Sequence, residues 1–497
     1  MKKCLLLCYL FISVNAFAQN RTNVWELSYS TSPIYPNTEV LFHNGVVDTQ
    51  SVDRIMSIYD TNTSICDTNG NLLFYTNGLT IGNRNYDTLQ NAVNFNPGYA
   101  TTSFEPLGMG IAQGAVIIPR PLNVNQYYIF YVTAEPIFAY GNNDTNPLYL
   151  SYSLIDMNLD NGLGGIVDSK KNLHAIDDTL VLGRLNAVKH ANGSDWWVIS
   201  HEYYTNKYYK LLVTPDSIIG PFSQNIGTNL KSNDIFGETV FSPDGSKFAM
   251  MNANNILDYM EFNRCSGEFY NVLSFEIPDS IGTYGCSFSS NNRFLYASSK
   301  YNLYQYDTWN PDMVSDGIHI AEWDSFTQNN VPVLFFLHQL GPDGKIYIGP
   351  FNGVSYLNVI NDPDSLGIGC NFSAHSFVIP DYNVNVPSFP NYDLGAVPGG
   401  DTCNAVYTTA LQLSLNTGSY SVAPNPVSDW LNIIYQSNED ALFELFDLYG
   451  KRVGAISLFH YFKNRLLNVS ELPPGVYLAA VSCQGERVWS EKVVVQR

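Results

Sequence analysis

A short hairpin pattern recurs along most of this 497-residue chain and limits what the chain can fold into. Residues 241–250 contain an apolar strand, a Pro-Asp-Gly turn and a second apolar strand. In such a turn Pro presets φ, Asp accepts hydrogen bonds from the following backbone, and Gly takes the positive φ. The pattern returns at residues 288–294 and 340–347, so neighbouring copies are about 50 residues apart. Looser copies begin at Asp67, Asn123 and Ala191.

Alternating strands follow several of these hairpins, at residues 257–264, 302–308 and 354–361. A unit of about 50 residues with about four strands is typical of a β-propeller blade. One such sheet cannot bury both of its faces alone, so neighbouring blades must cover it. The sequence therefore predicts an all-β fold with a β-propeller over residues 19–400.

The number of copies predicts the number of blades. Six hairpins are visible between Asp67 and Gly344, and residues 23–30 and 371–393 are left to form one more blade. We expect strands from both ends of the propeller to close the ring in that blade. Seven blades are therefore favoured, and six or eight remain open.

A different unit begins after the repeats stop near Val397. Residues 401–418 have the small polar composition of a linker, and residues 419–497 contain at least five short apolar strands. So many strands in fewer than about 80 residues predict a small β-sandwich.

Four sequence blocks in this last unit occur in a fixed order and reach the end of the chain. They are Ala-Pro-Asn-Pro at 423–426 before an apolar strand, Phe-Glu-Leu-Phe-Asp-Leu-Tyr-Gly-Lys-Arg-Val at 443–453, Leu-Pro-Pro-Gly-Val-Tyr-Leu at 472–478, and Glu-Lys-Val-Val-Val-Gln-Arg at 491–497. Together they resemble the type A C-terminal sorting domain of the type IX secretion system, a family found in Bacteroidota. An immunoglobulin-like accessory domain is the alternative.

This resemblance implies an address outside the outer membrane, secreted or attached to the cell surface, and the type IX machinery as a partner. Its motif residues here are Pro424, Asn425, Pro426, Gly450, Gly475, Tyr477 and Lys492. The hairpin region also resembles the WD-like and TolB-like propeller repeats of exported bacterial proteins, in which Phe-Ser-Pro-Asp-Gly occupies the same turn.

The N-terminus agrees with export. Two lysines follow Met1, an apolar run covers residues 5–14, and Ala-Phe-Ala at 16–18 is a cleavage pattern, so residues 1–18 are expected to be a signal peptide. No later stretch approaches the ~20 apolar residues that a transmembrane helix needs. The formal net charge of -20 also disfavours binding to nucleic acid or to an anionic membrane.

Six cysteines remain after the expected signal peptide, which permits disulfides in an exported chain without suggesting a disulfide-dependent fold. Cys265 and Cys286 lie in neighbouring repeat elements. They could pair with each other, or they could be two buried free thiols.

Candidate binding residues lie near the innermost strands, where a propeller ligand would meet the mouth of the central channel. They are Arg84, Gln113, His190, Glu238, His338 and Gln339. The alternative is that these residues fill the channel with water and hydrogen bonds. Trp196 and Trp197 could stack on sugar rings, but such residues more often fill the space between blades.

The sequence patterns that could indicate a catalytic site or a metal site are weak. His190 and His201 flank a predicted turn and could face each other as metal ligands or as an acid–base pair. The usual zinc, calcium, dinucleotide and serine-hydrolase patterns are missing, so neither a cofactor nor a metal is expected. The sequence favours an exported binding protein for a glycan or an envelope protein. The alternative is an extracellular hydrolase or lyase that acts on polysaccharide or peptide with groups from separate blades.

Overall fold

The computed structural model describes residues 20–29, 37–43, 45–54, 56–139, 142–230, 237–279, 282–315, 317–400, 403, 420–484 and 486–497. The expected signal peptide and, apart from Cys403, the expected linker lie outside these residues.

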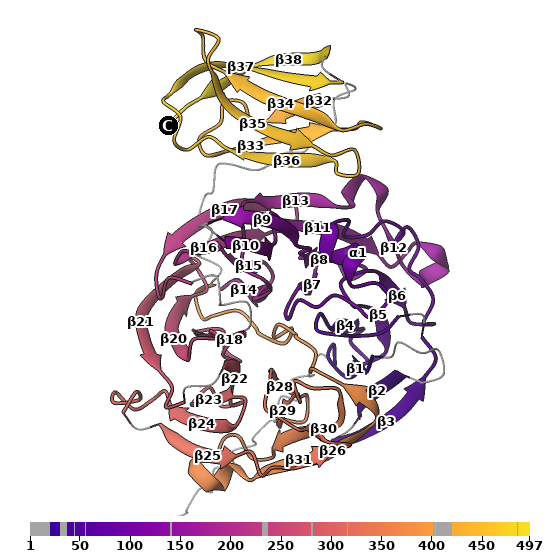
Figure 1. Cartoon of the computed structure of the whole chain (residues 1–497), viewed down its shortest axis with the longest axis vertical. Coiled ribbons are helices and arrows are strands. Elements are labelled where there is room, and N and C mark those ends of the chain that lie inside the picture. The colour runs from indigo at the N-terminus through magenta and orange to yellow at the C-terminus, as the bar shows by residue number, and fades with distance from the viewer. Residues whose placement is uncertain are drawn as a thin grey trace, which may run out of the picture.

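Seven small antiparallel sheets form a ring in the described part of the chain, and a separate β-domain lies against one side of the ring (Figure 1). We number the sheets as blades in chain order. Blade 1 contains β1 (Val24–Leu27), β2 (Asn37–His43) and β3 (Val46–Val52), and blade 2 contains β4 (Thr63–Cys66), β5 (Leu72–Thr76) and β6 (Ile81–Asn83). In blade 3, β7 (Ala115–Pro119) pairs with β8 (Gln126–Tyr131), β8 pairs with β11 (Tyr149–Asp156), and β11 also pairs with β12 (Gly165–Ile166) and β13 (Leu173–Asp177).

The next four blades each have four strands in sequential order. Blade 4 contains β14 (Asn186–Lys189), β15 (Trp196–His201), β16 (Lys207–Val213) and β17 (Ile218–Asn225). Blade 5 contains β18 (Thr239–Phe241), β19 (Lys247–Met251), β20 (Ile256–Asn263) and β21 (Glu268–Glu276). Blade 6 contains β22 (Thr283–Phe288), β23 (Phe294–Ser299), β24 (Asn302–Asp307) and β25 (Ile318–Glu322). Blade 7 contains β28 (His338–Leu340), β29 (Ile346–Ile348), β30 (Val354–Ile360) and β31 (Phe372–Asn383).

The remaining short elements lie in connections. They are the hairpins β9 (Glu135–Ala139)–β10 (Asn142–Asn146) and β26 (Thr327–Gln328)–β27 (Val331–Pro332), the helix α1 (Tyr99–Ser103), and the 3₁₀ turns η1 (Asp160–Gly162), η2 (Asp168–Lys170) and η3 (Gly367–Cys370). No helix in the described ranges is long and apolar enough to cross a membrane. The all-β propeller prediction is confirmed.

Each of the six hairpins seen in the sequence joins the first and second strands of a blade, in blades 2 to 7. The Pro-Asp-Gly turn of blade 5 has the expected mechanics. Asp244 Oδ1 accepts the backbone N–H of Ser246 at 2.9 Å, and Gly245 has φ +70°. A Cβ at Gly245 would lie 2.7 Å from Cγ2 of Val188 in blade 4. Glycine therefore serves both the turn and the close approach of two blades.

The ring does not close through a blade shared by the two ends of the propeller. β1 pairs with β2, and β2 pairs with β3, so blade 1 is entirely N-terminal. β31 is the fourth strand of blade 7, and its Tyr382 carbonyl accepts the backbone N–H of Tyr29 at 3.3 Å. The shared-blade prediction is wrong because enough strands exist at the N-terminus for a blade of its own, whose β1–β2 connection does not have the repeated turn.

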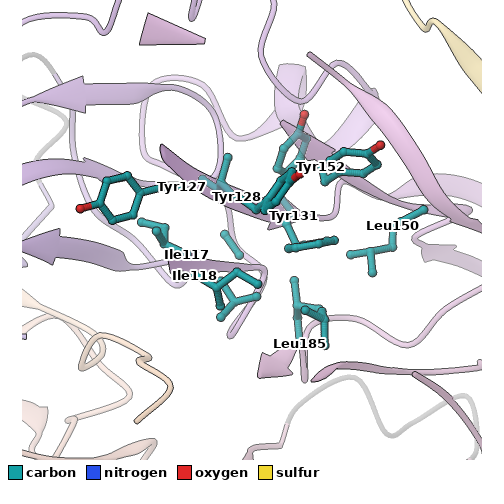
Figure 2. Packing of buried hydrophobic residues seen from close by; sticks show 14 of the residues in the cluster. Ile117, Ile118, Tyr127, Tyr128, Tyr131, Leu150, Tyr152 and Leu185 are labelled. Atoms are coloured by element: carbon teal, nitrogen blue, oxygen red, sulfur yellow. The ribbon is translucent and has the colours of Figure 1, made fainter. Parts of the chain in front are cut away.

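Apolar side chains fill the spaces between blades rather than one central core. In the cluster that joins blades 2, 3 and 4, Ile117, Tyr131 and Leu150 pack near Leu185 (Figure 2). Trp196 and Trp197 follow each other on β15 and pack into different clusters, on the blade 3 and blade 5 sides. Successive strand residues point to opposite faces, so both tryptophans are blade packing and each is only 1% exposed.

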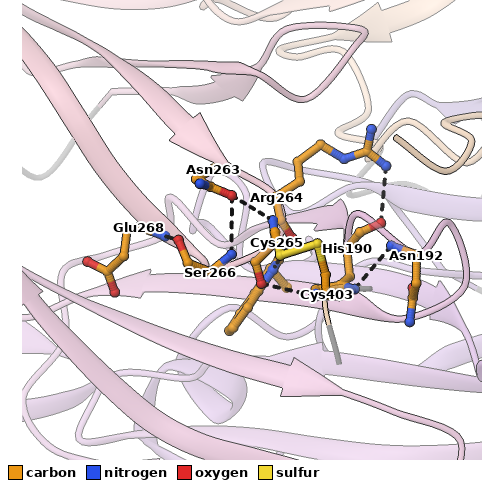
Figure 3. Close-up of a disulfide and its surroundings, with 9 residues drawn as sticks. His190, Asn192, Asn263, Arg264, Cys265, Ser266, Glu268 and Cys403 are labelled. Atoms are coloured by element: carbon orange, nitrogen blue, oxygen red, sulfur yellow. Dashed lines mark hydrogen bonds between the residues drawn. A yellow bond between two sulfur atoms is a disulfide. The ribbon is translucent and has the colours of Figure 1, made fainter. Parts of the chain in front are cut away.

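One disulfide ties the end of the propeller to blade 5. Cys265 in the turn between β20 and β21 pairs with Cys403, with their Cα atoms 5.4 Å apart (Figure 3). Cys286 is a buried free thiol in β22. The possible Cys265–Cys286 pair is therefore wrong. The true partner lies 138 residues away in a segment without any repeat pattern.

The C-terminal domain is a sandwich of two sheets. One contains β32 (Tyr420–Ala423), β33 (Trp430–Tyr435) and β36 (Asn464–Asn468), and the other contains β35 (Arg452–Leu458), β34 (Ala441–Phe446), β37 (Gly475–Cys483) and β38 (Glu486–Val495). β34 alternates buried and half-buried residues, as a strand with one face in a core requires.

This domain is docked on blade 3, where β36 lies along β13. Asn464 donates from Nδ2 to the His174 carbonyl at 2.9 Å and accepts the His174 N–H at Oδ1 at 2.7 Å. Buried Asp177 accepts hydrogen bonds from Arg465 Nε and His174 Nδ1, each at 2.8 Å, and from the Leu466 N–H. The docking is thus specified by a buried polar cluster, which the sequence did not indicate.

Candidate functional site

A cavity of about 290 Å³ lies in the centre of the ring, among the first strands of blades 4 to 7. Amide, hydroxyl and carboxyl side chains line it together with aromatic rings. They include Gln113, Asn186, Glu238, Ser287, Ser290, His338, Gln339, Phe241, Phe288, Phe389 and Tyr392. No lysine or arginine is among its lining residues in the described part of the chain.

One side of the cavity is formed by the segment that follows blade 7, residues 384–400, which we call the strap. It crosses the centre of the ring as the orange trace in Figure 1. Hydrogen bonds attach it to several blades: Ser388 N–H to the Asn62 carbonyl (2.9 Å), Tyr392 hydroxyl to the Ile117 carbonyl (2.7 Å), and Val397 N–H to the Ala191 carbonyl (2.9 Å). The disulfide at Cys403 follows directly, so the strap is anchored at both ends.

Glu238 connects three blades from inside the channel. Its Oε2 accepts the backbone N–H groups of Cys286 in blade 6 and His338 in blade 7, both at 2.9 Å. The side chain is buried, and this burial raises the pKa of Glu238 well above its usual range. Burial therefore favours the neutral form of this carboxyl group, which lines the cavity.

Gln113 connects blades across the channel in the same way. Its Oε1 accepts the Thr239 N–H at 2.9 Å and its Nε2 donates to the Thr239 carbonyl at 2.8 Å. Gln339 accepts the Phe389 N–H at 3.2 Å and so holds the strap. These amides make structural contacts between blades and between a blade and the strap.

His338 is also buried and lines the cavity. Its Nε2 shares a hydrogen bond with Ser298 Oγ at 2.8 Å, while Nδ1 is buried without a hydrogen-bond partner among the described residues. Burial lowers the pKa of His338 to about 3, so the ring is neutral. The neutral imidazole lies beside a carboxyl group whose charged form is disfavoured by burial.

The other two candidate residues lie elsewhere. Arg84 is exposed in the turn after β6, the outermost strand of blade 2, and does not line the cavity. His190 lies in the β14–β15 turn, where its Nε2 bonds to the Cys265 carbonyl at 3.1 Å beside the disulfide (Figure 3). Arg84 follows the outermost strand of its blade rather than an innermost one, and the sequence could not tell which end of β14, next to His190, meets the channel.

The proposed His190–His201 pair does not form. β15 separates the two residues, with His190 before its first residue and His201 at its last. His201 Nδ1 bonds to the Glu202 carbonyl at 2.7 Å, and burial lowers the pKa of His201 to about 3. The prediction is wrong because β15 holds the two rings at opposite ends of the strand, where each bonds to a backbone carbonyl. Among the described residues no group of three or more His, Cys, Asp or Glu could hold a metal ion.

Strap residues are the part of the site that sequence reasoning missed. Asn391 and Asp393 are exposed at the edge of the cavity, and Phe389 and Tyr392 add aromatic surface. The segment had been assigned to the closing blade. Pro387 and Pro390 were a usable signal against a paired strand, since proline cannot donate to a strand ladder.

The sorting-motif residues are distributed over the C-terminal sandwich. Asn425 covers the edge of β38 by accepting the Val494 N–H (2.9 Å) and donating to the Lys492 carbonyl (2.6 Å). Pro424 and Pro426 flank it, Gly450 has φ +80° in the turn after β34, and the Tyr477 hydroxyl donates to the Pro473 carbonyl at 2.7 Å. Gly475 is the first residue of β37.

Three of these motif residues, Gly450, Tyr477 and Lys492, line a groove of about 480 Å³ on the four-stranded sheet. In Figure 1 this sheet lies away from the ring, whereas β33 and β36 lie nearest to it. The Tyr477 side chain is buried in the core of the sandwich, so Gly450 and Lys492 are the exposed motif residues at this groove.

Comparison with known proteins gives one specific match. Residues 421–496 match the family described as "Secretion system C-terminal sorting domain". No curated protein is detectably similar in sequence to this chain.

Solved structures are similar only at a distance. A protein from Lactobacillus plantarum is 10% identical with a TM-score of 0.38, and the alignment covers 90% of this chain and 99% of that one. A putative 6-phosphogluconolactonase from Bacteroides fragilis is 8% identical with a TM-score of 0.40, covering 72% and 96%. The Cps50 (Swd1) β-propeller domain of Myceliophteria thermophila is 11% identical with a TM-score of 0.33, covering 67% and 94%. Such similarity says nothing about activity.

The fold and the family match agree on the kind of protein. The ring of seven sheets identifies the propeller, and the matched tail marks export by type IX secretion to the cell surface or the extracellular space. The chain is a β-propeller protein that ends in a type IX C-terminal sorting domain.

Proposed function

We propose that the protein is an exported binding protein whose propeller takes an uncharged, hydroxyl-rich ligand, a neutral glycan, at the central cavity. The observation that carries this proposal is the chemistry of the cavity wall. Amide, hydroxyl and aromatic groups line it, and lysine and arginine are absent from its described lining. Amides and hydroxyls bond to sugar hydroxyls, and aromatic faces cover the apolar faces of sugar rings.

The division of the chain belongs to the same proposal. Residues 1–18 direct export and are removed, residues 19–400 form the binding propeller, and residues 401–418 link it to the sorting unit at 419–497. The bound ligand lies between the strap and blades 5 to 7. Anionic sugars and phosphorylated compounds are disfavoured because no lysine or arginine is among the described residues that line the cavity.

A substitution at the edge of the cavity tests ligand binding. Ser290 lines the cavity and is exposed, so Ser290→Trp should block access without disturbing the fold. Isothermal titration against a panel of neutral and anionic oligosaccharides should show binding of neutral members and a loss of at least about tenfold in S290W.

Ser376→Trp is the matched control, because Ser376 is an exposed serine on β31 away from the cavity. It should bind like the native protein. Equal binding by S290W, or preference for anionic members, would contradict the proposal.

A second candidate function is a hydrolase, favoured by one observation. Burial favours the protonated form of Glu238, which lines the same cavity as exposed Asp393, and glycoside hydrolysis uses a protonated and an ionised carboxyl group. Glu238→Gln distinguishes the two functions, because its amide oxygen still accepts the two backbone N–H groups while the proton donor is lost. Turnover by the native protein that disappears in E238Q would establish the hydrolase, and unchanged binding without turnover would establish the binding protein.

A further inference from the structure

The groove on the C-terminal domain, lined in part by Gly450, Tyr477 and Lys492, has an apolar centre. Phe446 on β34 and Leu478 on β37 are direct cross-strand neighbours, and Leu478 is in turn opposite Lys492 on β38. Leu448, in the turn after β34, lines the groove and is 75% exposed. Leu478 is 42% exposed. Apolar side chains from two strands and a turn thus meet on a surface that the described part of the chain leaves uncovered.

Positive charge borders this apolar centre. Lys492 and Arg487 on β38 both line the groove, and the Arg487 guanidinium lies 5.9 Å from the centre of the Phe446 ring. The nearby carboxylate of Asp447 is engaged in its own turn, where Oδ1 accepts the N–H groups of Tyr449 and Lys451, each at 2.9 Å. The groove lining thus carries two cations against this one carboxylate, in a chain whose net charge is -20.

The groove lies on the sheet that points away from the propeller. The opposite sheet is docked on blade 3 through β36, with Asn464 and Arg465 bonded to His174 and Asp177. Docking through that sheet leaves the groove accessible while the propeller is attached (Figure 1). A surface that a partner must reach in the full-length chain has to meet this condition.

We propose that this groove is the surface by which the export machinery recognises the chain, and that its partner segment carries apolar side chains next to carboxylates. The inference rests on the proposed export function and names the recognition surface. Apolar contact fills the centre at Phe446, Leu448 and Leu478, and carboxylates of the partner pair with Arg487 and Lys492. The presence of the exposed motif residues Gly450 and Lys492 at the same groove is the independent observation that points to recognition.

Charge reversal in the full-length protein tests the proposal. The double variant Arg487→Glu and Lys492→Glu should accumulate in the periplasm, with the fraction outside the cell reduced at least about tenfold. Arg497→Glu is the matched control, because Arg497 is an exposed cation of the same domain outside the groove. It should be exported like the native chain. Thermal unfolding of each purified variant checks that the fold is kept.

A second, milder variant keeps the proposal testable if the double variant misfolds. Leu448→Ser changes a side chain that is 75% exposed and should lower export without lowering the unfolding temperature. A synthetic ten-residue peptide of alternating Leu and Glu, followed by fluorescence anisotropy, should bind the full-length protein at least about tenfold more tightly than its Leu–Lys counterpart. The double charge reversal should invert that preference.

Two results would overturn the inference: normal export of both groove variants, or equal binding of the two peptides. Deletion of residues 419–497 separates this failure from failure of the export function. If the deletion stops export while groove variants pass, the recognition surface lies elsewhere on the domain. If the deleted chain still leaves the cell, the sorting role itself is refuted.

Discussion

Two buried carboxyl groups face each other where blade 1 meets blade 2. Glu26 on β1 is opposite Glu39 on β2, and Arg54 Nη1 lies 2.6 Å from Glu26 Oε2. Burial raises the pKa of Glu26 to about 8, Arg54 opposes the rise and Glu39 adds to it. One of the two acids thus keeps its proton at neutral pH, because a single guanidinium neutralises only one carboxylate.

Because of this cluster, we expect the free energy of unfolding to fall as pH rises. The folded protein holds a proton on Glu26 that the unfolded chain releases near pH 4.5, so stability is highest below that pH and declines until about pH 8. The slope should reach about 1.4 kcal/mol per pH unit. Glu26→Gln cannot ionise and keeps an oxygen for Arg54, so its denaturation free energy should vary less with pH and exceed the native value at pH 9.

Urea denaturation from pH 5 to 9 measures the effect, with Glu276→Gln, at an exposed position of β21, as the control. Parallel curves for the native protein and E26Q would contradict this assignment of the proton.

At the scale of elements, the contact of β36 with β13 decides how the sorting domain is held. Arg465 and Asp177 form a buried ion pair with side-chain exposures of 10% and 2%. Removing one partner of such a pair leaves an uncompensated buried charge and costs about 3–5 kcal/mol. Arg465→Ala should therefore release the domain from blade 3, and hydrogen exchange should accelerate in β13 and β36 before it changes elsewhere.

Arg452→Ala is the natural comparison for that experiment. Arg452 pairs with Glu444 at 3.0 Å on the same domain, but its side chain is 58% exposed. Exposed pairs contribute about 0–1 kcal/mol, so this variant should behave like the native protein. Similar losses in the two variants would mean that docking does not depend on the buried cluster.

At the scale of the whole molecule, ring closure depends on contacts between residues that are remote in sequence. Trp25 of blade 1 is 1% exposed. The centre of its ring lies 4.8 Å from that of Phe42 and 5.2 Å from that of Tyr347 in blade 7. Trp25→Ala should lower the unfolding free energy by about 3–5 kcal/mol. Since the contact joins both ends of the ring, hydrogen exchange should increase in β1 and in blade 7 together.

Trp309→Ala controls for loss of a large aromatic residue, since Trp309 is 64% exposed in blade 6. It should cost little and leave protection of β1 unchanged. Loss of protection confined to blade 1 would show that the ring does not close cooperatively.

Much of this architecture could be predicted from local chemistry. Turns such as Ser242–Gly245 and the apolar strands beside them define hairpins on their own, because turn geometry and strand periodicity depend on neighbouring residues. The same holds for the blocks of the sorting domain, whose strands and turns lie within fewer than about 80 residues.

The candidate site, by contrast, could not be predicted from local patterns, because it forms where segments far apart in the sequence meet. Nothing near Glu238 in sequence indicates that it accepts N–H groups from Cys286 and His338, and nothing near Cys403 indicates Cys265 as its partner. Gln113 lines the cavity and Arg84 does not, although both lie near strands of the ring.

The sequence by itself determined the repeated hairpins, the all-β ring and the sorting tail, because these follow from contacts within about 50 residues. Only the tertiary structure decided how the ring closes, where the strap crosses it, which carboxyl group stays protonated and which face of the tail is exposed. Those features arise from burial and packing between segments far apart in the chain, and local sequence patterns do not encode which segments will meet.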